Sequence, residues 1–286
     1  MKNTYLERTA LLSLLDEHVR SGTIGGLLEL KALFKGSEFG HLENEVFGSA
    51  TTQALLDRDY GMQEAVSMSF LANEVRKHLS EDVWPLAVGN VIRGLSEECE
   101  YTGISRSELY EHLKGSCRTI DVGRITPEWV KDFLRKAAER VIPLHIVSSV
   151  PKSLSERILA EILGEKLKLN GGVFGGDVAI ERLYPFKPAG KVWIETIKEF
   201  PTNPMPKLWL LVEANEKSAL YALRRLREAG HEAVAIVVTG GRSMSDITGN
   251  LDRLILRYRE LEWAASKIYV CHLAEEENRQ IFGLLA

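Results

Sequence analysis

The sequence predicts an α/β fold, an open three-layer sandwich with a Rossmann-like parallel sheet, preceded by a mostly helical region. Two observations indicate this. First, short apolar runs alternate with amphipathic helical segments from about residue 120 to 240, a pattern typical of parallel strands joined by crossover helices. Second, the 286 residues are 45% hydrophobic and 27% charged, which is enough apolar material for a sizeable core.

The first elements of this core carry local signals. A helix is expected over 126–141, with Thr126 as its N-cap and Pro127 at its first position, because these residue types favour helix starts. The apolar residues after it predict a strand at 144–148. A second helix follows, where Ser153 begins a capping box.

The later elements follow the same alternation. The glycine- and proline-rich stretch at 171–190 predicts a loop or hairpin. Two further strands are expected at 208–213 and 233–239, each preceded by a helix. The remaining residues predict a long helix, a strand in the segment KIYVCHL and a final helix.

Charge and cysteine usage exclude several classes of protein. The net charge is −4 and the sequence shows no basic patch, which argues against a nucleic-acid partner. No run approaches the roughly 18 apolar residues of a membrane helix, and the charged first segment does not resemble a signal peptide. Three widely spaced cysteines, Cys99, Cys117 and Cys271, are typical of reduced thiols. We therefore expect a cytoplasmic protein without a membrane partner.

Polar residues follow several apolar runs, where open α/β sheets bind ligands. Asp57 and Asp59 follow a short apolar run, Ser148 ends the strand at 144–148, and Glu213 ends the strand at 208–213. Lys191 begins the helix before that last strand. Carboxylates, a hydroxyl and an ammonium in this order suit phosphoryl transfer, in which one acid attacks phosphorus and another moves the proton. The hydroxyl and ammonium bind phosphate oxygens, and a carboxylate helps to hold Mg²⁺.

The order and spacing of these residues resemble the haloacid dehalogenase-like (HAD) superfamily, in particular its phosphoserine-phosphatase-like branch. The resemblance implies a phosphomonoesterase or phosphotransferase that acts on a small phosphorylated metabolite through an aspartyl-phosphate. Asp57 would be the nucleophile and Asp59 the acid/base, while Ser148 and Lys191 would bind phosphate. Asp57 and Glu213 would hold Mg²⁺.

The same resemblance implies a division of the chain. It covers a core at 47–240 with a helical cap at about 62–122, between an N-terminal helical extension at 1–46 and a C-terminal α/β extension at 241–286. The acidic motif departs from the family, since Val212 to Lys217 replaces the usual Gly-Asp-x-x-x-Asp. Lys217 places positive charge where a second acid is usual, so we expect weak metal binding and weak phosphatase activity.

Other readings of the same residues stay open. Asp57 and Asp59 suit a solvated turn, Ser148 and Glu213 suit helix caps, and Lys191 suits a solvated helix start. The segment VVTGGRS at 237–243 is also typical of a loop that cradles a phosphate or nucleotide, which favours a non-catalytic, Rossmann-like binding or interaction module. Glu213 followed by this segment is similar to a Toprim nuclease, although Cys271 and His272 stand where that module needs acids.

Overall fold

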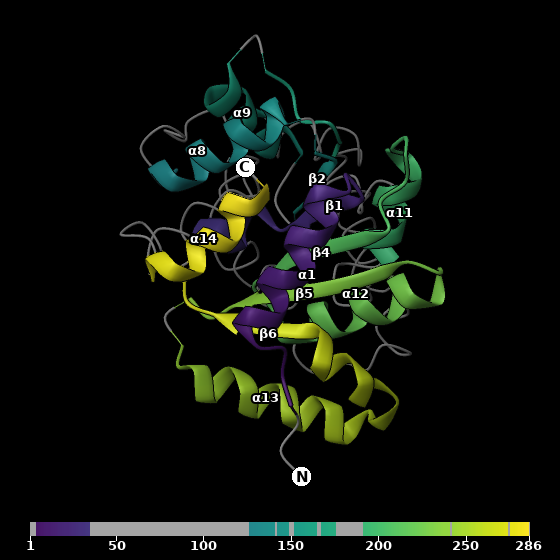
Figure 1. Ribbon diagram of the computed structural model, residues 1–286. Coiled ribbons are helices and arrows are strands. Elements are labelled where there is room, and N and C mark those ends of the chain that lie inside the picture. Colours follow the sequence, from purple (N-terminus) through teal and green to yellow (C-terminus); the bar gives the residue numbers. More distant parts are fainter. Residues whose placement is uncertain are drawn as a thin grey trace, which may run out of the picture.

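The computed structural model describes residues 4–34, 126–140, 142–148, 152–164, 167–175, 191–240, 242–273 and 275–285. Six parallel strands form one sheet in the order β3-β2-β1-β4-β5-β6 (Figure 1). The α/β class with a parallel sheet is therefore confirmed. The strands are β1 Ile24–Leu28, β2 Leu144–Val147, β3 Val173–Phe174, β4 Leu208–Glu213, β5 Glu232–Val238 and β6 Ile268–Cys271.

Strands β2, β4, β5 and β6 coincide with the strands expected from the sequence, within a residue at most ends. Strand β3 is a two-residue strand inside the glycine-rich stretch that predicts a loop or hairpin. Strand β1 was not expected, yet it lies in the middle of the sheet, hydrogen-bonded to β2 and β4. The sheet thus takes β1 and β6 from the two segments assigned to terminal extensions. The predicted cap at 62–122 lies outside the described residues.

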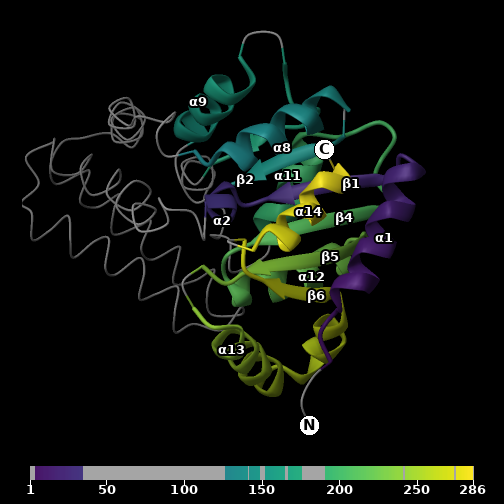
Figure 2. The same ribbon diagram turned by 60° about the vertical axis from the view of Figure 1, so that its left-hand side comes forward.

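Helices cover both faces of the sheet, as the figures show for α1 and α14 on one face and α12 on the other (Figures 1 and 2). The first face carries α1 Arg8–Arg20, α2 Leu30–Phe34, α8 Glu128–Glu139, α9 Lys152–Leu163 and α14 Glu276–Leu285. The second face carries α11 Lys191–Glu199, α12 Glu216–Glu228, α13 Met244–Arg257 and the 3-10 helix η3 Arg259–Lys267.

A local signal explains the start of α12, whereas the start of α8 differs from the prediction. Asn215 caps α12, since its Oδ1 accepts a hydrogen bond from the Ser218 backbone N–H at 3.0 Å. Helix α8 starts one position later than expected: Pro127 is its N-cap, so Thr126 is not. The Ser153 side chain lies outside the described part of the structure. No helix in the described residues is long and apolar enough to cross a membrane.

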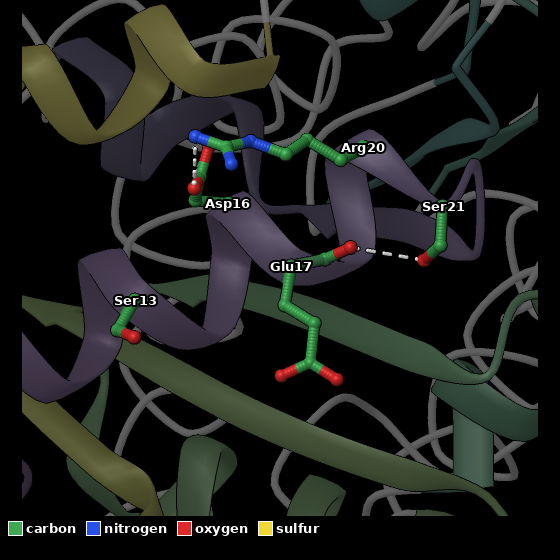
Figure 3. Close-up of a pocket in the computed structure, with 5 residues that line it drawn as sticks. All are labelled: Ser13, Asp16, Glu17, Arg20 and Ser21. Atoms are coloured by element: carbon green, nitrogen blue, oxygen red, sulfur yellow. Dashed lines mark hydrogen bonds and ion pairs between the residues drawn. The ribbon is translucent and has the colours of Figure 1, made fainter.

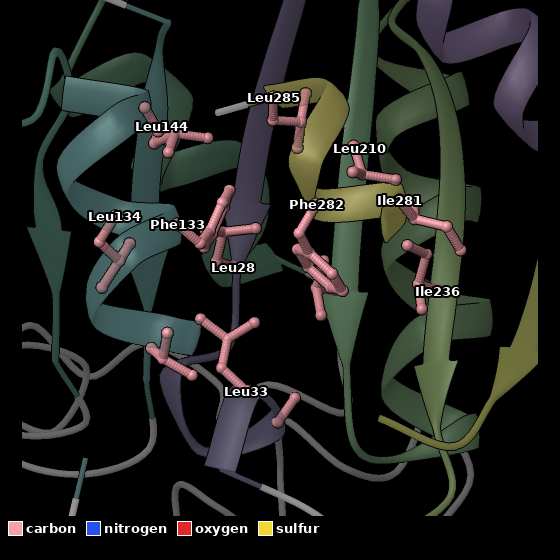
Figure 4. Close-up of a cluster of buried hydrophobic side chains, with 14 of the residues drawn as sticks. Leu28, Leu33, Phe133, Leu134, Leu144, Leu210, Ile236, Ile281, Phe282 and Leu285 are labelled. Atoms are coloured by element: carbon pink, nitrogen blue, oxygen red, sulfur yellow. The ribbon is translucent and has the colours of Figure 1, made fainter. Parts of the chain in front are cut away.

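Two hydrophobic clusters hold the three layers together. On the first face, Phe133 of α8 and Phe282 of α14 pack edge to face, with ring centroids 5.2 Å apart, over Leu28 and Leu210 of the sheet (Figure 4). On the second face, Trp193 and Trp209 are fully buried among side chains of α12 and α13. The sheet is therefore buried on both sides, as the apolar composition of its strands requires.

Near the amino ends of the strands, Trp209 lies against the backbone of β1. A β-carbon on Gly25 would come within 2.7 Å of the Trp209 ring and 2.6 Å of Pro206, so only glycine fits there. The ring reaches His145 of β2, with centroids 5.5 Å apart, and Phe200 stacks on the same imidazole, with centroids 6.1 Å apart. We call His145, Phe200 and Trp209 the aromatic cluster.

His145 is fully buried. Its Nδ1 accepts a hydrogen bond from the Gly172 backbone N–H at 3.1 Å, so the ring proton resides on Nε2. That Nε2 has no hydrogen-bond partner among the described residues. Desolvation lowers the pKa of His145 to about 4, and the side chain is therefore neutral at physiological pH.

Candidate functional site

The strand order has a switch point between β1 and β4. From β1 the chain builds outward through β2 and β3, then crosses back and builds through β4, β5 and β6 on the other side. In open α/β sheets, ligands bind beyond the carboxyl ends of the strands at such a point. One polar residue follows or ends each of five neighbouring strands, a row that we call the carboxyl edge: Ser148, Glu29, Glu213, Thr239 and His272.

Glu29 and Glu213 lie at the switch point itself. Leu28 pairs with Val212, and the Glu29 backbone N–H donates to the Val212 carbonyl at 2.9 Å, so the two glutamates stand one position further along the same ladder. Residues that pair in register point to the same face, on strands about 4.8 Å apart. Both side chains are buried, with 3% and 2% of their surface exposed. The register thus places two buried glutamates next to each other along the sheet, at the expected ligand position.

Hydrogen-bond donors surround both carboxylates. The Ser148 hydroxyl, itself buried, donates to Glu29 Oε1 at 3.1 Å. Glu213 Oε2 accepts the backbone N–H groups of Ala214 and, at 3.3 Å, of Asn215. These donors offset part of the cost of burying the two acids. The cap of α12 is Asn215 and α9 begins only at Lys152, so neither Glu213 nor Ser148 serves as the helix cap that the sequence also allowed.

An ion pair between the exposed Arg242 and the buried carboxylate of Glu216 fixes the turn after β4. Arg242, from the loop after β5, donates to both carboxylate oxygens of Glu216, at 2.7 and 3.2 Å. Asn250 of α13 donates to the same carboxylate at 3.1 Å. Lys217 lies with its Nζ 5.7 Å from the ring centroid of Tyr221, one turn further along α12. The ammonium that the sequence placed beside a metal is therefore directed along the helix.

The polar side chains of the loop after β5 form hydrogen bonds within the protein. Ser243 caps α13 by accepting the Asp246 backbone N–H at 3.1 Å, and its hydroxyl donates to the Asp246 carboxylate at 2.6 Å. An acid in the first turn disfavours a second anion at that helix start. Thr239 Oγ1 and His272 Nδ1 are 2.7 Å apart. The described residues of this loop therefore lend no support to a phosphate cradle, and the described end of β6 lends none to a Toprim site.

The residues named from the sequence have different outcomes. Asp57 and Asp59 lie outside the described residues, so their catalytic roles stay predictions. Lys191 is the first residue of α11, but its side chain also lies outside the described part. Ser148 and Glu213 lie at the ends of β2 and β4, with β1 between them. Glu29 was missed: the apolar run before it contains two glycines, a pattern typical of turns rather than of central strands.

Two glutamates of the carboxyl edge are groups of the kind that bind Mg²⁺ in proteins. Mg²⁺ prefers one or two carboxylates and completes its shell with water and phosphate oxygens, and Glu29 and Glu213 supply two such groups. No cluster of three or more His, Cys, Asp or Glu side chains suitable for a metal occurs among the described residues. The described edge therefore fits Mg²⁺ only together with water or a bound phosphate.

A surface hollow of about 470 Å³ lies elsewhere, along α1 (Figure 3). Its lining includes the exposed ion pair of Arg20 and Asp16, with 2.8 Å between Nη2 and Oδ2. The end of α1 leads into the start of β1, so this hollow lies toward the amino ends of the strands, opposite the carboxyl edge. Exposed pairs of this kind contribute little energy, and we assign the hollow no function.

No family model, curated protein or solved structure matches the chain. Its function is therefore inferred from the chemistry of the carboxyl edge.

Proposed function

We propose that the protein binds a small phosphorylated molecule together with Mg²⁺ at the carboxyl edge, and that it hydrolyses the phosphomonoester slowly. The observation behind this proposal is the pair of buried carboxylates, Glu29 and Glu213, on neighbouring strands at the switch point. The buried hydroxyl of Ser148 donates a hydrogen bond to Glu29. Acidic oxygens for a cation beside a donor for phosphate oxygens are what such a ligand needs.

The order of the residues along the chain supports the HAD-like reading. In that family the first acid follows the first strand, the cap comes next, and the hydroxyl, lysine and last acid follow. Here Glu29 follows β1, Ser148 follows β2, Lys191 starts α11 and Glu213 ends β4. The interval between β1 and β2, where the family inserts its cap, spans 115 residues, from 29 to 143. On this reading Glu29 stands in the place of the first aspartate.

Each residue then has a chemical role. Ser148 and Lys191 donate to phosphate oxygens, and Glu29 and Glu213 hold the cation, which neutralises phosphate charge when bound. Hydrolysis in this family begins when a carboxylate attacks phosphorus and the bond to the leaving alcohol breaks, with the acid, Asp59 in the roles predicted from the sequence, giving that oxygen its proton. Water then cleaves the acyl phosphate and releases inorganic phosphate. Asp57 is the nucleophile predicted from the sequence, whereas Glu29 occupies the corresponding position in the sheet.

Slow turnover follows from two local features. Glu29 is one methylene longer than the aspartate of the family, which displaces its oxygens from the usual position of attack. Its carboxylate also already accepts the Ser148 hydroxyl, so phosphate must displace that hydrogen bond in order to bind. The same contact favours a second candidate function, a binding module that holds a phosphorylated ligand without cleaving it.

The test is hydrolysis of a generic aryl phosphate, with and without Mg²⁺, combined with melting curves in Mg²⁺ and inorganic phosphate. We expect slow, Mg²⁺-dependent turnover in the wild type and a loss of at least about tenfold in Glu29→Gln and Glu213→Gln, as expected when a metal ligand or nucleophile is removed. Glu232→Gln, at the amino end of β5, is the matched control and should behave like the wild type.

The remaining outcomes separate the alternatives. Loss of turnover in Asp57→Asn, with Glu29→Gln fully active, would assign the nucleophile to Asp57 as the sequence predicts. A melting shift with Mg²⁺ and phosphate but no turnover in any variant would favour the binding module. A wild type that shows neither turnover nor a melting shift would contradict the proposal in both forms.

A further inference from the structure

We infer that Arg242 is a positioning residue for the proposed cation site, acting through the turn that follows β4. This inference rests on the proposed function, because it concerns how Glu213 is directed toward the cation. Arg242 belongs to the loop after β5, on the neighbouring strand. It lies outside the set of residues that the resemblance to phosphatases implies, and its contacts alone suggest its role.

The contacts of Arg242 converge on the turn at 213–216. Its Nη1 and Nη2 bind the two carboxylate oxygens of Glu216, and Nη2 also donates to the Ala214 carbonyl at 3.5 Å. The Glu213 carboxylate accepts the backbone N–H groups of Ala214 and Asn215 from inside the same turn. The Ala214 carbonyl and the Asn215 N–H belong to one peptide group. Arg242 binds the carbonyl of this group, and the N–H of the same group binds the Glu213 carboxylate.

Burial of its acid distinguishes this ion pair from the others, although the Arg242 side chain itself is 44% exposed. The Glu216 side chain is only 3% exposed, whereas the acid of the Lys267–Glu232 pair is 53% exposed. A buried carboxylate that accepts three hydrogen bonds has one arrangement, and a planar guanidinium with two parallel donors fixes that arrangement more tightly than a single ammonium does. Outer contacts of this kind orient the residues that bind a metal directly.

The inference predicts a specific effect on Mg²⁺ affinity. In Arg242→Ala the turn loses its outer support, Glu213 samples other directions, and the dissociation constant for Mg²⁺ rises by at least about tenfold, the usual range for lost outer-shell contacts. Arg242→Lys keeps the charge beside Glu216 but cannot reach both of its oxygens and Ala214 together. We expect its dissociation constant to lie between those of the wild type and Arg242→Ala.

The experiment is calorimetric titration of the full chain with Mg²⁺ in the presence of inorganic phosphate, with melting temperatures recorded in the absence of Mg²⁺. Lys267→Ala, which removes an ion pair between Glu232 of β5 and the last residue of η3, is the matched control and should bind Mg²⁺ like the wild type. A merely structural role for Arg242 would lower the melting temperature and leave the affinity of the folded protein unchanged.

Failure of the inference and failure of the proposed function give different results. If the wild type binds no Mg²⁺, the proposed function is wrong and the inference falls with it. If the wild type binds Mg²⁺ and folded Arg242→Ala binds it equally well, only the inference is wrong. Should Arg242→Ala not fold, Arg242→Lys decides: weaker binding supports the inference, and wild-type affinity overturns it.

Discussion

The two ends of the same parallel sheet bury polar groups in opposite ways. At the amino end, His145 is enclosed by the rings of Trp209 and Phe200, and desolvation keeps it neutral. At the carboxyl end, Glu29 and Glu213 are equally buried but accept hydrogen bonds from a hydroxyl and from backbone N–H groups. Side chains at the amino end contribute to stability through packing. At the carboxyl end, two buried acids lower the stability of the fold, a cost that is common at binding sites.

The largest expected effect lies at the amino end, in Gly25→Val. The new side chain would overlap Pro206 and the Trp209 ring, and overpacking of a filled core should lower the free energy of unfolding by about 2 to 3 kcal/mol. Urea unfolding measures it. Gly249→Ala in α13 is the control, since nothing lies within 4 Å of its β-carbon, and it should raise the free energy of unfolding by about 0.5 to 1 kcal/mol. Equal stability of the two variants would show that the Trp209 ring does not need the glycine.

A smaller effect is expected when the aromatic cluster is acidified. The pKa of His145 is about 4 in the folded protein and about 6.5 when unfolded, so between these values the unfolded state binds the extra proton. The free energy of unfolding is therefore unaffected by protonation of His145 above pH 6.5, and it decreases as the pH falls from 6.5 toward 4. Linkage gives a loss of about 2 kcal/mol between pH 7 and pH 5.

The measurement is the free energy of unfolding at pH 7 and pH 5, for the wild type and for His145→Gln. The variant cannot titrate, so its pH dependence should be flatter by that amount. Desolvation also lowers the pKa of His231, and that residue supplies a pH dependence common to both proteins. Parallel curves would contradict the assignment of this pH dependence to His145.

The smallest effect on stability is expected at the carboxyl end, in Glu213→Gln. The amide oxygen still accepts the N–H of Ala214, while one of two neighbouring negative charges disappears. Without Mg²⁺ the free energy of unfolding should therefore stay the same or rise by up to about 1 kcal/mol. With Mg²⁺ and phosphate, the melting shift of the wild type should be lost. A large destabilisation without Mg²⁺ would mean that Glu213 serves the fold rather than a ligand.

The sequence predicted those parts of the fold whose signals are local. Strands β2, β4 and β5 are apolar runs between amphipathic helices, and periodicity is sufficient to find them. Strand β1 escaped prediction because Gly25 and Gly26 resemble a turn. Glycine is needed at these two positions because β-carbons there would overlap Trp209 and Leu144. Both residues are far away in the sequence, so no local pattern can predict these contacts.

The same reason explains what was found and missed at the candidate site. Ser148 and Glu213 end strands that could be recognised, so the rule for strand ends located them. Glu29 ends the strand that was missed, and its closeness to Glu213 depends on the strand order. The ion pair of Arg242 with Glu216 joins the loop after β5 to the first residue of α12, and only the pairing of β4 with β5 brings those two segments together. The sequence predicted Lys217 beside the proposed metal site, whereas its Nζ lies 5.7 Å from the ring centroid of Tyr221. Spacing along the chain does not show in which direction a side chain points.

The central position of β1 also affects how the protein folds during its synthesis. Ile24 pairs with Leu208, 184 residues later in the chain. At about 5 to 20 residues per second, a ribosome needs roughly 10 to 40 s to make that partner after β1 has emerged. A strand of five apolar or glycine residues waits through this interval as an unpaired edge, which is a hazard for aggregation. The two glycines lower its tendency to pair wrongly, so the residues that admit Trp209 in the finished fold also protect the nascent chain.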